Sequence, residues 1–222
     1  MRVKRLVPLL GFVLSGCLFG GGGNDRLPPR RPAGAPPVTL NLPTSRETQM
    51  CYADLSREKV RYSPLPDRDY GGGCTVIGAV QLIDIGVPVT GLKAMRCGLA
   101  EEFIGWTRNA VAPAAYQILG SRLVKIETFG TYACRNTIGA PTTRLSGHAL
   151  ANAVDVSAFI LEDGRRVSIE NDWRADDPEK RRFFEAIHIS ACKRFGTVLS
   201  PDYNWAHHNH LHLEDDHKSF CR

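Results

Sequence analysis

Polar and apolar residues alternate along residues 208–214, near the C-terminal end of the chain, where the sequence reads HNHLHLE. A period of two is typical of a β-strand, in which residues two apart share one face. His208, His210 and His212 are therefore predicted to lie on one face of a strand, with the two leucines on the other. Imidazoles on a single strand do not complete a tetrahedral metal site by themselves, so another segment has to supply further ligands.

The rest of the apolar pattern predicts a mixture of helices and strands. Helices are expected over residues 47–59, over 98–119 with a kink at Pro113, and over 177–195, where Asp176 or Asp177 starts the helix and Pro178 lies in its first turn. Strands are expected within residues 71–89, 122–135, 152–161, 165–169 and 196–200, the third and fourth forming a hairpin around the turn EDGR. This pattern predicts an α+β domain with a central antiparallel sheet flanked by helices.

The first residues have the layout of a secretory signal. Three basic residues at positions 2–5 precede an apolar core that is too short to span a bilayer. The core ends in LSGC, which resembles the bacterial lipoprotein box, so residues 1–16 are predicted to be a signal peptide and Cys17 to be lipidated. By the same resemblance, Leu18 favours the periplasmic face of the outer membrane. The alternative is an ordinary signal peptide that ends near a cysteine.

The composition then changes twice along the chain. Residues 17–45 are predicted to be a tether, because glycine, proline and arginine dominate there and no apolar period appears. Residues 46–222 are predicted to be one domain, which is long enough to bury a sizeable core. We expect this domain to be a monomer.

Charge and motifs exclude several classes of function. The formal net charge of +5 falls to +2 once the signal peptide is removed. No basic run is interleaved with aromatic residues, so nucleic acid is not an expected partner. The sequence also contains no H-E-x-x-H, no G-x-S-x-G and no glycine-rich phosphate loop, which argues against thermolysin-like enzymes, serine hydrolases and nucleotide binding.

Cysteine usage is typical of an oxidising compartment. Six cysteines follow Cys17, and an even number in an exported domain favours three disulfides, which allow 15 connectivities. Metal binding by these cysteines is disfavoured, because no C-x-x-C spacing is present. Short loops close most readily, so neighbouring cysteines are predicted to pair, as Cys51–Cys74, Cys97–Cys134 and Cys192–Cys221.

The missing metal ligands are found upstream, in the stretch RLSGHALANAVDVSAF. It contains His148 and Asp155, and Asp155 falls inside an apolar strand pattern. A carboxylate is costly to bury there unless it is paired or bound to a metal. A histidine on the loop that enters the strand can reach the same cation. The alternative is a buried hydrogen bond between His148 and Asp155 without a metal.

These residues carry a resemblance to a known superfamily. SGHALANAVD resembles S-x-H-x-x-G-x-A-x-D, a signature of the zinc peptidases that include D-alanyl-D-alanine carboxypeptidases, murein endopeptidases and the hedgehog signalling domain. The later HLH resembles the H-x-H that supplies a third ligand and a base. Over residues 50–222, the stretches TYACR, CKRFGTVLSPDYNWAHHNHLHLE and the closing CR resemble the bacterial extensin-like C-terminal domain family. Ala151 departs from the motif, which has glycine at this position.

The resemblance implies a role for each of six residues. It implies that His148, Asp155 and His212 bind one zinc ion, with the fourth position left to water, as in catalytic sites. His210 would take a proton from that water and pass it to the leaving amine. His207 matches a supporting histidine of the murein endopeptidases, and Arg135 matches an arginine that polarises the scissile carbonyl or binds a substrate carboxylate. Two alternatives stay open: His210 as a spectator beside the metal, and Arg135 paired with an acidic neighbour.

The sequence therefore favours a lipid-anchored zinc peptidase of the cell envelope that acts on peptidoglycan stem peptides or cross-links. It does not say whether the enzyme is a carboxypeptidase or an endopeptidase. Two other functions are compatible with the same residues: a peptidoglycan-binding module without turnover, and an envelope-tethering protein in which the domain is structural.

The predicted anchor leads to a direct test. Replacing Cys17 with serine should release the protein from the membrane fraction and leave the domain folded, because the acylated side chain is lost. Fractionation followed by immunoblotting measures this, and membrane association that persists in Cys17→Ser would rule out lipidation at this residue.

Overall fold

The computed structural model describes residues 42–138 and 144–222 of the 222-residue chain. Its α-helices are α1 (Ser45–Arg57), α2 (Cys97–Trp106), α3 (Ala112–Leu119), α4 (Ile169–Asp172) and α5 (Pro178–Arg194). Its strands are β1 (Arg61–Pro64), β2 (Arg68–Asp69), β3 (Thr75–Val76), β4 (Ala79–Asp84), β5 (Val89–Thr90), β6 (Met95–Arg96), β7 (Leu123–Gly130), β8 (Ala153–Leu161), β9 (Arg166–Ser168), β10 (Thr197–Leu199), β11 (Leu211–Glu214) and β12 (Phe220–Cys221). The segments predicted as helices and strands all contain the expected type of element.

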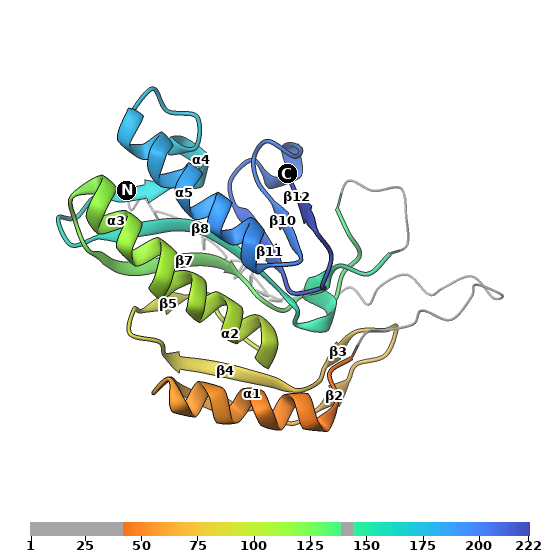
Figure 1. The fold of residues 1–222 in the computed structure, drawn as a ribbon. Helices are drawn as coiled ribbons and strands as arrows, with labels where there is room; N and C mark the ends of the chain where they lie inside the picture. The colour runs from red at the N-terminus through yellow and green to blue at the C-terminus, as the bar shows by residue number, and fades with distance from the viewer. Residues whose placement is uncertain (1–41, 139–143) are drawn as a thin grey trace, which may run out of the picture.

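The largest sheet has the strand order β12-β10-β11-β8-β7-β5, and β9 pairs with β8. Most of its neighbours are antiparallel, whereas β12 pairs with β10 and β5 pairs with β7 in parallel. Helices α2 and α3 both contact α5, and the three lie over this sheet, while α1 lies beside β4 (Figure 1). The predicted α+β class is thus confirmed as helices packed on mainly antiparallel sheets. A single domain over residues 46–222 stays a prediction.

The hydrophobic core holds β8 in place from the helical side. Phe159 of β8 packs edge-on against Trp106 of α2 and Phe183 of α5, with ring centroids 6.3 and 5.3 Å apart. The Trp106 indole is fully buried and donates a 2.9 Å hydrogen bond to the Ile187 carbonyl, which ties α2 to α5. A buried indole N–H needs such a partner. The strand that carries Asp155 is therefore fixed by packing and not by a loop.

The helix predicted over residues 98–119 contains a π-helical turn just before Pro113, and the kink itself stays a prediction. Thr107–Val111 is the π-helix η1, which continues α2 into α3 without an interruption. Pro113 lies in the first turn of α3, where a missing backbone N–H is tolerated. The chain therefore remains helical across the proline.

Two of the three predicted disulfides are wrong. The structure pairs Cys51 with Cys97 and Cys74 with Cys134, in place of Cys51–Cys74 and Cys97–Cys134. The third pair, Cys192–Cys221, is the one predicted. Doubling a loop costs only about 0.6 kcal/mol of closure entropy. Loop length is therefore a weak guide to which cysteines pair. The packing of α1 on α2 decides the partner of Cys51.

The predicted signal peptide, Cys17 and nearly all of the predicted tether lie in residues 1–41, outside the described residues. Among the residues that the structure does describe, no helix combines the length and the hydrophobicity needed to cross a bilayer.

The disulfide assignment is testable by counting thiols. In a Cys74→Ser/Cys134→Ser variant no cysteine of residues 42–222 should be free, whereas Cys51→Ser/Cys74→Ser should expose the thiols of Cys97 and Cys134. Thiol titration under denaturing, non-reducing conditions measures this, and the reverse result would restore the pairing of sequence neighbours. Because the Cys74–Cys134 bond closes 60 residues, its loss should lower the free energy of unfolding by about 4 kcal/mol.

Candidate metal centre

Two strands of the large sheet place Asp155 and His212 directly opposite each other. Strands β8 and β11 are antiparallel neighbours, with Asp155 paired to His212 and Val156 paired to Leu211. The valines beside Asp155 and the leucines beside His212 are fully buried in the core. The alternation along both strands therefore sends the apolar side chains to the core and the two polar ones to the opposite face.

His148 reaches the same face from a short turn. It lies in the 3-10 helix η2 (Gly147–Leu150), whose N-cap Ser146 accepts the His148 backbone N–H. The turn ends at Ala151, which has a left-handed φ of 53°. This is the position where the related motif has glycine, so the alanine methyl costs about 1–2 kcal/mol of backbone strain. Alanine in place of glycine therefore strains the turn but leaves His148 in position.

Atoms of the three side chains converge to a common point. His148 Nε2 lies 3.2 Å from His212 Nδ1 and 3.0 Å from one Asp155 carboxylate oxygen, and His212 Nδ1 lies 2.9 Å from the other. Within the described residues these side chains form a group that is able to hold a metal ion, and all three are buried. Two ligands bound to zinc at roughly 2.0–2.1 Å and the tetrahedral angle are about 3.3 Å apart. The spacing therefore suits a tetrahedral cation.

The position of the His148 ring proton also indicates that a cation binds between these side chains. His148 Nδ1 lies 3.1 Å from the Thr131 carbonyl, which only accepts, so Nδ1 carries the proton of a neutral ring. Its Nε2 lone pair then faces a carboxylate oxygen 3.0 Å away. Two lone pairs repel at this distance unless a proton or a metal ion lies between them. The residues present thus fit a bound metal ion.

Without a metal, protons on the histidines would have to compensate the buried carboxylate. Burial works to raise the pKa of Asp155, but contacts with His148 and His212 hold it well below its usual value. Burial works to lower the pKa of His212, but hydrogen bonds to Asp155 and Glu214 raise it to about 9. A metal ion at this point would take the place of the proton on His212 Nδ1 and leave the one on Nε2.

His207 and His210 lie next to this group. The His210 ring is 5.1 Å from the His207 ring, and its Nε2 lies 3.5 Å from Asp155 Oδ1. Burial, together with neighbouring cationic groups, lowers the pKa of each of these two histidines to about 4. Both rings are therefore neutral near pH 7. His207 Nδ1 lies 2.7 Å from the Asn204 side-chain oxygen, which fixes its proton on Nδ1 and leaves Nε2 as a lone pair.

Arg135 is at the margin of the cluster. One of its Nη atoms lies 3.9 Å from Asp155 Oδ2, and its side chain is 35% exposed. The guanidinium thus has both an acidic neighbour and access to solvent. The two predicted roles, substrate contact and pairing with an acid, are compatible with this position.

His208 does not belong to the predicted histidine face. Residues 205–207 form the 3-10 helix η3 (Trp205–His207), and β11 begins only at Leu211, so the period of two stops short of His208. The His208 ring instead stacks on Trp205, with centroids 4.2 Å apart. His210 precedes the strand but still points to the cluster.

Two interacting groups were missed by the sequence reasoning. The Thr131 carbonyl is a backbone atom and leaves no signal in the residue type. Glu214 is two residues beyond His212 on the same strand, and its Oε2 lies 3.3 Å from His212 Nε2. The pattern H-x-E on a strand would have indicated this contact, because residues two apart share a face.

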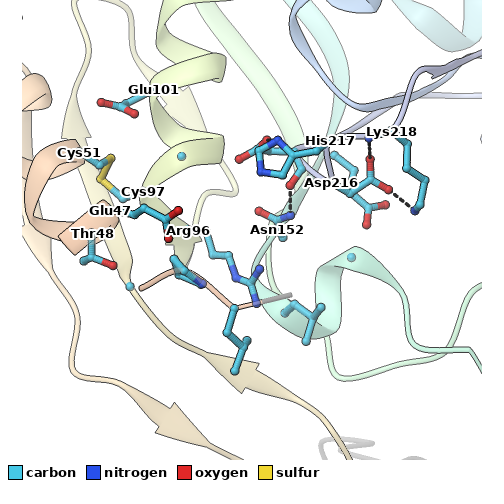
Figure 2. Close-up of a pocket in the computed structure, with 18 of the residues that line it drawn as sticks. Glu47, Thr48, Cys51, Arg96, Cys97, Glu101, Asn152, Asp216, His217 and Lys218 are labelled. Atoms are coloured by element: carbon cyan, nitrogen blue, oxygen red, sulfur yellow. Dashed lines mark hydrogen bonds and ion pairs between the residues drawn. A yellow bond between two sulfur atoms is a disulfide. The ribbon is translucent and has the colours of Figure 1, made fainter. Parts of the chain in front are cut away.

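Glu214 also separates the metal cluster from a cavity. The cavity has a volume of about 830 Å³ and lies between α1, the start of α2 and the segment after β11. Glu101 of α2, Arg96 of β6 and Asp216, which follows β11, are among the residues that line it (Figure 2). Burial and nearby acidic groups raise the pKa of Glu101. None of the three metal-ligand candidates lines this cavity, so it is distinct from the cluster.

A second group with ligand-type atoms has a different explanation. His188, Cys192 and Cys221 lie close together, and His188 Nε2 is 3.6 Å from the Cys221 sulfur. The two sulfurs are joined in a disulfide, so neither is available as a thiolate ligand.

The comparison with family models confirms the predicted resemblance to the extensin-like family, whereas the resemblance to the zinc peptidase superfamily stays a prediction. Residues 49–222 match the model of the family described as "Extensin-like protein C-terminus", and the chain therefore belongs to this family. No curated protein matches the chain, and no solved structure matches it.

The cluster predicts which substitutions remove the metal. Alanine variants of His148, Asp155 and His212 should each lose stoichiometric binding, because one of three protein ligands is gone, whereas His210→Ala should keep most of it. Elemental analysis after dialysis against zinc measures the content. If His210→Ala loses the metal and His212→Ala keeps it, the two roles are exchanged; if all four variants keep it, the site lies elsewhere.

Proposed function

We propose that this chain is a zinc-dependent peptidase of the bacterial cell envelope that cleaves peptidoglycan stem peptides or their cross-links. The observation that carries the proposal is the convergence of His148 Nε2, His212 Nδ1 and the Asp155 carboxylate, with neutral His210 beside them. The resemblance of SGHALANAVD to the motif of D-alanyl-D-alanine carboxypeptidases and murein endopeptidases supports the substrate class.

The donor set favours zinc. Two imidazole nitrogens, which are borderline donors, together with one carboxylate oxygen suit this ion, and three protein ligands leave one position open. A zinc ion bound there would polarise the scissile carbonyl and lower the pKa of a bound water.

His210 is the residue best placed to move the proton. Its Nδ1 lies 2.9 Å from the Asn209 side-chain oxygen, which places the ring proton on Nδ1. The Nε2 lone pair then faces the metal cluster and is able to accept a proton from water. Returning this proton to the leaving amine completes the cycle. The neutral His207, whose ring centroid lies 5.1 Å from that of His210, supports the base without contacting the reacting atoms.

Arg135 and two aromatic side chains line the approach. The Arg135 guanidinium is permanently charged and offers two parallel N–H donors, which suits a substrate carbonyl or a terminal carboxylate. Phe129 contacts the His210 ring and Tyr203 contacts the His207 ring, and both remain exposed. These rings are available to contact the substrate beside the base.

The function is tested with purified muropeptides. The soluble zinc-loaded chain should hydrolyse them, and mass spectrometry of the products distinguishes carboxypeptidase from endopeptidase cleavage. His210→Ala should lose about 100-fold to 10,000-fold in rate while keeping zinc, the usual effect of removing a general base. His208→Ala is the matched control, because that ring stacks on Trp205 and should leave the rate unchanged.

Two results would contradict this proposal. Zinc binding without any cleavage of muropeptides or whole sacculi would favour a peptidoglycan-binding or tethering protein that retains the metal. Equal rates for His210→Ala and wild type would show that another group moves the proton.

A further inference from the structure

Glu214 is placed behind His212, on the side away from the converging ligand atoms. It is the last residue of β11, and its Oε2 lies 3.3 Å from His212 Nε2. The side chain is 17% exposed, so water competes weakly for the carboxylate. Among the described residues, this is the contact that faces the outer nitrogen of His212.

This contact decides which nitrogen of His212 is available as a ligand. A neutral imidazole carries one proton, and the nitrogen without it supplies the lone pair. A carboxylate accepts and does not donate, so the proton is held on Nε2 and the lone pair is on Nδ1. Nδ1 is the atom that lies 2.9 Å from Asp155 and 3.2 Å from His148 Nε2.

In His148 the two ring nitrogens have the opposite roles. Its Nδ1 proton points to the Thr131 carbonyl, and its Nε2 joins the cluster. The two histidines thus use different nitrogens, and each has an acceptor behind it. The acceptor of His148 is a neutral carbonyl, whereas that of His212 is an anion, which makes the imidazole a stronger donor to a metal.

Gly147 leaves the space that the Glu214 carboxylate occupies. A Cβ atom added at Gly147 would lie 2.5 Å from the Glu214 carboxyl carbon. Such a methyl group would displace the flexible end of Glu214. The glycine before His148 therefore contributes to the contact on His212.

We propose that Glu214 is a positioning residue that holds the His212 proton on Nε2 and thereby sets the affinity of the site for zinc. The inference rests on the zinc site of the proposed function, but it does not require peptide hydrolysis. It assigns to Glu214 no contact with substrate.

Zinc affinity of the full soluble chain, measured by competition with a chromogenic chelator, tests the inference. Glu214→Ala should bind zinc about 10-fold to 100-fold more weakly than wild type, the usual effect of losing such a partner. Glu214→Gln, whose amide oxygen still accepts a hydrogen bond, should lose less. Glu101→Gln is the matched control, because it removes a carboxylate from the same cavity without contacting His212, and it should bind like wild type.

A second readout reports the proton itself. Long-range ¹H–¹⁵N correlation spectra of the zinc-loaded chain should show the His212 proton on Nε2 and a metal-bound Nδ1. Thermal melting of the metal-free variants shows whether each one folds. Should Glu214→Ala fail to fold, Glu214→Gln and Gly147→Ala provide the same comparison, and Gly147→Ala should also weaken zinc binding.

Three outcomes overturn the inference. The first is equal zinc affinity in wild type and the folded Glu214 variants. The second is an equal loss in Glu101→Gln, which would indicate a general charge effect. The third is a His212 proton on Nδ1 in the zinc-loaded chain. Failure of muropeptide cleavage with zinc affinity behaving as expected would contradict only the proposed function.

Discussion

The structure depends on one buried carboxylate. Asp155 lies near the start of β8, a strand that is buried almost throughout, and only 7% of the residue is exposed. An ionised carboxyl group at such a position costs several kcal/mol unless positive charge and hydrogen bonds offset the loss of water. His148, His212 and Arg135 all face it, each from a different segment of the chain. The need to compensate this one charge therefore fixes the positions of a turn, a strand and a loop relative to one another.

The candidate metal ligands and the proposed base are held in place in different ways. Asp155 and His212 are on paired strands, and β8 is held from the other side by Phe159 against Trp106. His207 and His210 lie in the segment between β10 and β11, where side-chain contacts with Asn204 and Asn209 orient the rings. A metal site requires fixed distances, whereas a residue that transfers protons has to accept and release them. The rigid paired strands suit the candidate ligands, and the segment between β10 and β11, where hydrogen bonds orient the rings, suits the proposed base.

Periodicity in the sequence predicted the elements that are strongly patterned. The convergence of His148 and His212 was expected instead from the buried position of Asp155 and from the resemblance to the zinc peptidases. The helix that starts at Asp177 and the strand that contains Asp155 follow directly from the periodicity. What it could not predict depends on distant packing or on backbone atoms. The partners of Cys51 and Cys74 are decided by which elements pack together, and the acceptor behind His148 is a carbonyl. His208 was misplaced because a 3-10 turn interrupts the alternation just before β11.

Strand β12 has a consequence for the edge of the large sheet. β12 consists of Phe220 and Cys221, and it covers the edge of β10, the neighbour of the strand that carries His212. Cys221 is also bonded to Cys192 at the end of α5. If β12 is unpaired, β10 has an open edge to which other chains are able to pair. The Cys192–Cys221 disulfide ties β12 to α5 and so helps to keep this edge covered, and its reduction would favour pairing between molecules beside the metal cluster.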